Sequence, residues 1–147
     1  MISTTAMTAR SILFTEGKKA AAKLKKLTPK ATGKTRGAIK PQVRKDASGH
    51  RLEIITPASF IFAIRGRGPG KMPPENSIAQ WLDLKGLSEK SYGIRKKIAV
   101  EGTKLWMGKG KDNLKTADKI LDDMAGSITS KLADLQVKET LKKIDGN

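Results

Sequence analysis

The feature that most constrains this chain is an apolar stripe over residues 113–144. Its members recur at spacings of 3, 4, 3, 4, 4 and 3 residues, which is the period of one helical face: Leu114, Ala117, Leu121, Met124, Ile128, Leu132 and Leu135. The stripe predicts a single helix of roughly 45 Å, with Gly126 as the one candidate for an interruption. Residues 111–147 are therefore assigned as a C-terminal helical extension.

The predicted helix has no net charge, because residues 111–147 hold 7 basic and 7 acidic residues. A neutral helix with one apolar stripe can pack in either of two ways. It packs against another chain, which we favour, or it folds back on the sheet of its own chain. On the favoured reading, we expect four stripe residues to contact a partner or another copy: Leu121, Met124, Ile128 and Leu132.

The rest of the chain is strongly basic. Residues 1–110 hold 23 Lys and Arg against 7 Asp and Glu, which accounts for the whole net charge of +16. Between Arg10 and Lys45 there are 12 basic residues and one acid, Glu16. Such a field attracts polyanions, whether DNA, RNA or an acidic protein surface. The candidate contacts are Lys18, Lys19, Lys23, Lys25, Lys26, Lys34 and Arg36.

A first helix is predicted from about Ser3 to Leu27. Its apolar stripe has spacings of 4, 3, 4 and 3: Leu13, Gly17, Ala20, Leu24 and Leu27. Most of the helix lysines fall off that stripe, so they form either a plain solvated face or a surface for DNA or an acidic neighbour. Pro29 ends the helix, because the residue before a proline is pushed out of the α region.

Strands are expected from Gly33 to about Ile64. Residues 38–56 predict a hairpin, with turn chemistry at Asp46-Ala47-Ser48-Gly49 and a β-branched return strand. The apolar run Ser59–Ile64 predicts a further short strand. Together with the helices, these strands indicate an α+β domain over residues 1–110, in which a small antiparallel sheet packs with the N-terminal helix and two following helices.

The two following helices come after an unusual loop. Residues 65–74 contain three Gly, three Pro and three cations, so neighbours or a partner must order them. We expect Arg65, Arg67 and Lys71 to contact a partner, against the alternative of an exposed linker. A helix then starts at Pro73-Pro74-Glu75, buries Ile78, Trp81 and Leu82, and is capped by Gly86. A second helix starts at Ser88 or Ser91, carries Ile94, Ile98 and Leu105, and ends near Trp106.

Several classes of function are excluded by composition. The sequence has no cysteine and one histidine, His50, which rules out thiolate and multi-histidine metal sites. No base is placed to activate a serine, and the adjacent Asp122 and Asp123 would face different sides of a helix. We expect neither an enzyme nor a cofactor. No apolar run approaches the roughly 20 residues needed to cross a membrane, so we expect a soluble protein.

The order of these elements resembles the tail-completion (head–tail joining) proteins of tailed bacteriophages. A basic helix, then Thr32-Gly33-Lys34-Thr35-Arg36-Gly37-Ala38-Ile39, then a hairpin is similar to the opening of that family. Residues 66–74 with Ile78, Trp81, Ile94 and Gly102-Thr103 look like a variant of its later segment. The likeness covers roughly residues 5–106. The family's Tyr…Glu-x-Gly-Thr segment is replaced here by Phe60–Arg67.

The resemblance implies a structural virion protein repeated around a ring at the portal–tail junction. Its partners would be other copies of the chain, portal or connector proteins and tail proteins, with non-specific contact to DNA. It would be made in the host cytoplasm and located in the neck of the virion. The alternative from another class is a basic nucleic-acid-binding protein, and a weaker one is a small basic enzyme or nuclease accessory factor.

Overall fold

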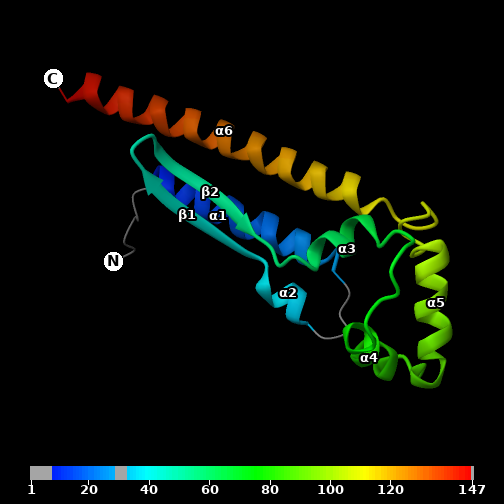
Figure 1. The fold of residues 1–147 in the computed structure, drawn as a ribbon. Coiled ribbons are helices and arrows are strands. Elements are labelled where there is room, and N and C mark those ends of the chain that lie inside the picture. The colour runs from blue at the N-terminus through cyan, green and yellow to red at the C-terminus, as the bar shows by residue number, and fades with distance from the viewer. Residues whose placement is uncertain (1–7, 29–32, 147) are drawn as a thin grey trace.

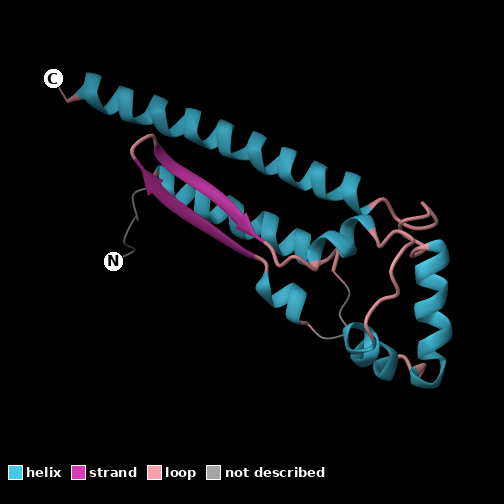
Figure 2. Cartoon of the chain, in the orientation of Figure 1, coloured by secondary structure: helices cyan, strands magenta, loops and turns pink. Residues whose placement is uncertain are grey.

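The computed structural model describes residues 8–28 and 33–146, which adopt the expected α+β fold (Figures 1 and 2). A two-stranded antiparallel sheet is combined with several helices, including a long C-terminal one. In chain order the elements are α1 (Ala9–Lys25), α2 (Lys34–Ala38), β1 (Lys40–Asp46), β2 (Gly49–Ile55), α3 (Phe60–Arg65), α4 (Glu75–Leu84), the 3-10 turn η1 (Ser88–Lys90), α5 (Ser91–Glu101) and α6 (Asn113–Asp145).

Helix α1 begins with a reciprocal cap. The Ser11 amide donates to the Thr8 hydroxyl (3.2 Å), and the Thr8 amide donates to the Ser11 hydroxyl (3.0 Å). Two amides that lack a helical partner are thereby satisfied. The predicted residues 3–7 and Pro29 lie outside the described residues. Within that part, the helix follows the predicted stripe, with Gly17, Ala20 and Leu24 buried.

The predicted hairpin is confirmed. Strands β1 and β2 pair in register from Lys40 with Ile55 to Asp46 with Gly49. At the turn, the Asp46 carboxylate accepts hydrogen bonds from the Ser48 amide (2.9 Å) and the Ser48 hydroxyl (2.6 Å). Two isolated strands are marginally stable in water, so the hairpin depends on the helix beneath it.

The hairpin packs on α1 across a glycine. A Cβ at Gly17 would lie 2.7 Å from Cδ1 of Leu52 and 3.0 Å from Cβ of Pro41. The helix backbone and the hairpin can therefore approach closely only because position 17 has no side chain. Helix α6 covers another side of α1 and runs antiparallel to it, so α1 is the middle layer (Figure 1).

The core lies where α1, the base of the hairpin, α3 and the start of α6 meet. Its five buried members come from four separate segments: Ala21, Leu24, Ile39, Phe60 and Ala117. Half-buried apolar residues surround them, among them Ile54 and Ile120. We call this part, made of α1, α2, the hairpin, α3 and α6, the hairpin lobe.

The strand predicted over residues 59–64 is wrong, since Phe60–Arg65 forms helix α3. Phe60, Ala63 and Ile64 face the core, whereas Ile61 and Phe62 are exposed. Spacings of 3 and 4 belong to a helix, because a strand would bury alternate residues. A short apolar run has no clear period of its own, so the surface it packs against decides its conformation.

Two neighbouring boundaries also differ from the prediction. Residues Lys34–Ala38 form the short helix α2, so strand structure begins at Lys40 and not at Gly33. Helix α5 ends at Glu101, well before Trp106. Gly102 follows with a φ of 81°, a left-handed conformation that terminates the helix without strain only in glycine.

Residues 67–111 form a second part, which we call the helical lobe. It contains α4, η1 and α5, the two following helices of the prediction. Helix α4 buries Leu82 and ends as predicted at Gly86, whose φ is 65°. The Leu87 amide donates to the Leu82 carbonyl (2.9 Å) and the Gly86 amide to the Asp83 carbonyl (3.0 Å), the paired bonds of a glycine-terminated helix.

Helix α6 confirms the long helix that the stripe predicted. It has 33 residues, equivalent to about 50 Å, and Gly126 does not interrupt it. Its first half packs on α1 and α3, so the helix folds back on its own chain, but on a helix and not on the sheet. Its last turns lie at the end of the molecule opposite α4 and α5 (Figure 1).

Candidate interaction surfaces

The predicted polyanion contacts gather mainly on α1. Four of its lysine side chains are exposed, and two of them, Lys19 and Lys23, lie beside α6: Lys18, Lys19, Lys23 and Lys26. We call them the lysine face. The ammonium of Lys18 also lies 4.8 Å from the centre of the Phe14 ring. Lys25 is half-buried, and Lys34 is exposed on α2, away from this face.

The side chain of Arg36 makes hydrogen bonds within the chain and is only partly exposed. Its Nε donates to the carbonyl of Lys25 (2.9 Å) and its Nη2 to the carbonyl of Thr28 (3.1 Å). The end of a helix leaves carbonyls without partners, and a cation there also opposes the helix dipole. The guanidinium of Arg36 therefore caps the C-terminal end of α1 and connects α2 to α1.

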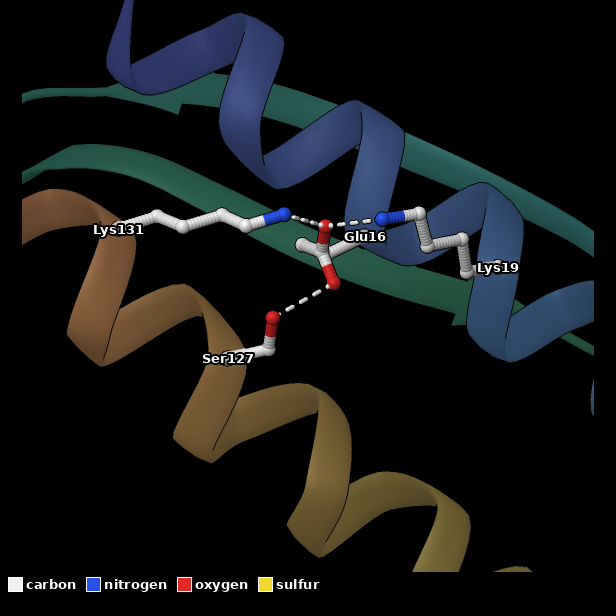
Figure 3. Close-up of polar contacts among 4 residues, drawn as sticks. All are labelled: Glu16, Lys19, Ser127 and Lys131. Carbon is white, nitrogen blue, oxygen red and sulfur yellow. Dashed lines mark hydrogen bonds and ion pairs between the residues drawn. The ribbon is translucent and has the colours of Figure 1, made fainter.

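Glu16 is the centre of a polar cluster between α1 and α6 (Figure 3). The carboxylate is buried and accepts hydrogen bonds from the ammonium of Lys131, from the ammonium of Lys19 (3.0 Å) and from the hydroxyl of Ser127 (2.9 Å). The hydrogen bond from Lys131 and then that from Lys19 lower the pKa of Glu16 to about 2, although burial opposes the shift. The same contact raises the pKa of Lys131.

Sequence reasoning missed this cluster. Its signal was present, since Glu16 is the single acid among 12 basic residues and precedes the buried Gly17. The partners could not be named, because Ser127 and Lys131 lie more than 110 residues away. The cluster joins the two helices and leaves the carboxylate without solvent access, so it fixes the register of α6 on α1.

The loop that joins α3 to α4 is ordered by contacts within the chain. The Thr103 amide donates to the Arg67 carbonyl (2.8 Å), the Gly70 amide to the Ala99 carbonyl (2.8 Å), and Arg95 Nε to the Pro73 carbonyl (2.7 Å). At Gly66 (φ 75°) a Cβ would lie 2.5 Å from the Trp106 nitrogen. The glycines therefore allow the loop to lie directly on the segment after α5.

The three cations of this loop have different surroundings. Arg67 donates to the Lys71 carbonyl (3.2 Å) and lies 5.7 Å from the centre of the Phe62 ring, so part of its bonding capacity is used inside the chain. The side chains of Arg65 and Lys71 are exposed. Contact of these residues with a partner stays a prediction.

The α6 residues expected to contact a partner divide in two. Met124, Ile128 and Leu132 are half-buried, while Leu121 is 39% exposed on the outer side of the helix. The stripe therefore serves packing within the chain in its first half. Farther along, apolar residues that the prediction did not single out are exposed on α6: Val137, Leu141 and Ile144.

An apolar groove of about 540 Å³ lies between α4 and α5. Its walls are the side chains of Ile78, Trp81, Ile94, Ile98 and Met107, and the ammonium-bearing Lys97 and Lys104 stand among them. Trp81 was expected on the buried face of its helix but is 37% exposed. The helical lobe thus opens its apolar side to solvent.

None of the helices in the described ranges combines the length and apolar character that crossing a membrane requires. Within residues 8–28 and 33–146, no three side chains among His, Cys, Asp and Glu come together as metal ligands would. No family model, curated protein or solved structure matches the chain.

Proposed function

We propose that this chain is a structural virion protein of a tailed phage, a tail-completion or connector subunit that forms a ring at the head–tail junction. The observation that carries the proposal is surface area. The chain exposes 10875 Å², whereas a compact monomer of 15.9 kDa exposes about 7,400 Å². The excess of roughly 3,500 Å² is the size of a permanent subunit interface.

The distribution of exposed apolar side chains supports a subunit with neighbours on more than one side. Large apolar residues are exposed at both ends of the molecule, for example Trp81, Tyr92 and Val100 in the helical lobe and Val137 and Leu141 on α6. Large exposed apolar patches mark interaction sites in soluble proteins. A heterologous pair of surfaces on one subunit closes into a ring when its rotation permits.

The resemblance to tail-completion proteins supplies the location and the partners. A basic helix followed by a hairpin opens the chain, as in that family. The ring would stand between portal or connector proteins and tail proteins in the neck of the virion, and would be made in the host cytoplasm. A role in assembly requires no catalytic constellation and no cofactor.

The test is the mass of the purified protein, alone and mixed with the portal of a tailed phage from the same source. Native mass spectrometry and electron microscopy should find a closed homo-oligomer, or a monomer that closes into a ring on the portal. A chain that stays monomeric under both conditions would contradict the proposal.

The lysine face favours a second candidate function, non-specific binding of DNA. Since Lys19 pairs with Glu16, the other three lysines would give a slope of about −2.7 for the logarithm of the binding constant against that of salt concentration. Lys23→Glu with Lys26→Glu should weaken binding and flatten this slope. Lys109→Glu with Lys111→Glu makes the same charge change on an exposed connector and is the control. If both double variants lost the same amount of affinity for DNA, net charge alone would explain the binding.

A further inference from the structure

The last turns of α6 carry an apolar stripe that the chain itself leaves uncovered. Val137, Leu141 and Ile144 are spaced 4 and 3 residues apart, so they share one helix face. They are between 52% and 65% exposed. Asp134 and Asp145 lie on the same face and flank the stripe at its two ends. This face thus presents three aliphatic side chains, with two carboxylates and the ammonium of Lys138 beside them.

The groove between α4 and α5 has the complementary character. Its walls are aliphatic and aromatic, and its cations are Lys104 and Lys97, whose ammonium lies 3.9 Å from the carboxylate of Glu101. At about 540 Å³ the groove can accept several aliphatic side chains, since one water molecule takes about 30 Å³. An amphipathic helix that enters such a groove with residues i, i+4 and i+7 is a common mode of peptide recognition.

The two surfaces cannot meet within one chain, because they lie at opposite ends of the molecule (Figure 1). We propose that the Val137–Ile144 stripe of one copy occupies the α4–α5 groove of the next copy. The contact is head-to-tail, so every subunit donates one helix and accepts one. It rests on the proposed ring function, for which it names the interface between neighbouring subunits.

The area agrees with this arrangement. A standard interface buries about 800 Å² on each partner, and a subunit with two neighbours buries two such patches. Their sum falls within the excess surface of roughly 3,500 Å² estimated from chain mass, and the remainder is available for portal and tail proteins. Pairing of Asp134 and Asp145 with Lys97 and Lys104 would add attraction between opposite charges to the apolar contact.

The first test places a charge on the stripe of the full chain. Leu141→Asp should raise the concentration needed for assembly by about tenfold or more, as loss of a central apolar contact does. Gln136→Asp adds the same charge to the same exposed segment of α6 on a different face, and should assemble like the parent. Analytical ultracentrifugation gives the assembly state, and circular dichroism checks that each variant is folded.

The second test separates a head-to-tail contact from pairing between two α6 helices. Trp81→Asp in the groove should also block assembly. A mixture of the Leu141→Asp and Trp81→Asp chains holds one intact stripe and one intact groove, so it should stop at dimers. If Trp81→Asp assembles like the parent while Leu141→Asp does not, the helices pair with one another and the proposal is overturned.

Cross-linking tests the same contact without a disruptive substitution, because the chain has no cysteine of its own. A Leu141→Cys chain mixed with a Lys104→Cys chain should form a covalent dimer with a short bis-maleimide linker, and a Gln136→Cys chain should not. If the parent chain forms rings and all of these variants assemble and cross-link alike, the proposed interface is overturned. The proposed ring function is then unaffected. If the parent chain is monomeric both alone and on the portal, the proposed interface and the proposed ring function are both contradicted.

Discussion

The two lobes differ in how they use apolar residues. In the hairpin lobe, α1 lies between the hairpin and α6, and side chains from four segments form a buried core. In the helical lobe, Leu82 is the one large apolar side chain that is fully buried among the described residues, and its neighbours Trp81 and Ile94 line an open groove. The hairpin lobe buries its apolar side chains within the chain, whereas the helical lobe leaves part of its apolar surface open to solvent.

The largest effect expected from this difference comes from shortening α6. Deletion of residues 113–147 should abolish cooperative unfolding, because it removes Ala117 and Ile120 from the core and strips one side of α1. Deletion of residues 133–147 removes mostly exposed positions and should lower Tm by less than about 4 °C. Thermal melts followed by circular dichroism compare the two. A folded 1–112 chain would mean that α6 is an independent extension after all.

A single truncation in each lobe sharpens the comparison. Ile39 is fully buried in the core, so Ile39→Ala should lower the free energy of unfolding by about 2–5 kcal/mol. Ile94 is half-buried in the groove wall, and Ile94→Ala should lower it by about 1 kcal/mol or less. Urea titration of the two variants measures both. Equal losses would show that the helical lobe has a core of its own.

Two glycines test how closely the layers of the hairpin lobe are packed. Gly17→Ala places a Cβ 2.7 Å from Leu52 and 3.0 Å from Pro41, and overpacking of this kind should destabilise the fold by about 1–3 kcal/mol. At Gly126 a Cβ meets nothing within 4 Å, so Gly126→Ala should stabilise the protein by about 0.5–1 kcal/mol through helix propensity. Opposite signs in urea titration are the expected result.

The last comparison concerns the effect of pH on the contact between α1 and α6. Because folding lowers the pKa of Glu16 from 4.5 to about 2, its contribution to stability is complete above pH 5 and is lost as the pH falls towards 2. Glu16→Gln should lower the free energy of unfolding at pH 7 by about 1–2 kcal/mol. The difference between parent and variant should shrink on acidification. A difference that stays constant from pH 7 to pH 3 would contradict the assigned pKa.

Local patterns in the sequence predicted the elements whose cause is local. The i, i+3, i+4 stripe of α6, the stripe of α1, the Asp46–Gly49 turn and the Gly86 cap each depend on residues within a few positions of one another. These signals carry the same meaning in any fold. Local patterns also predicted the α+β class and the order of helix, hairpin and following helices.

Tertiary structure decided what local patterns leave open. The Phe60–Arg65 run is apolar enough for either a strand or a helix, and the core it packs against selected the helix. Arg36, a candidate contact for a polyanion by its charge, donates hydrogen bonds to two carbonyls at the end of α1. Glu16 found its partners on α6, more than 110 residues away. Burial of a carboxylate and exposure of a groove depend on which distant segments meet, and sequence spacing does not record that.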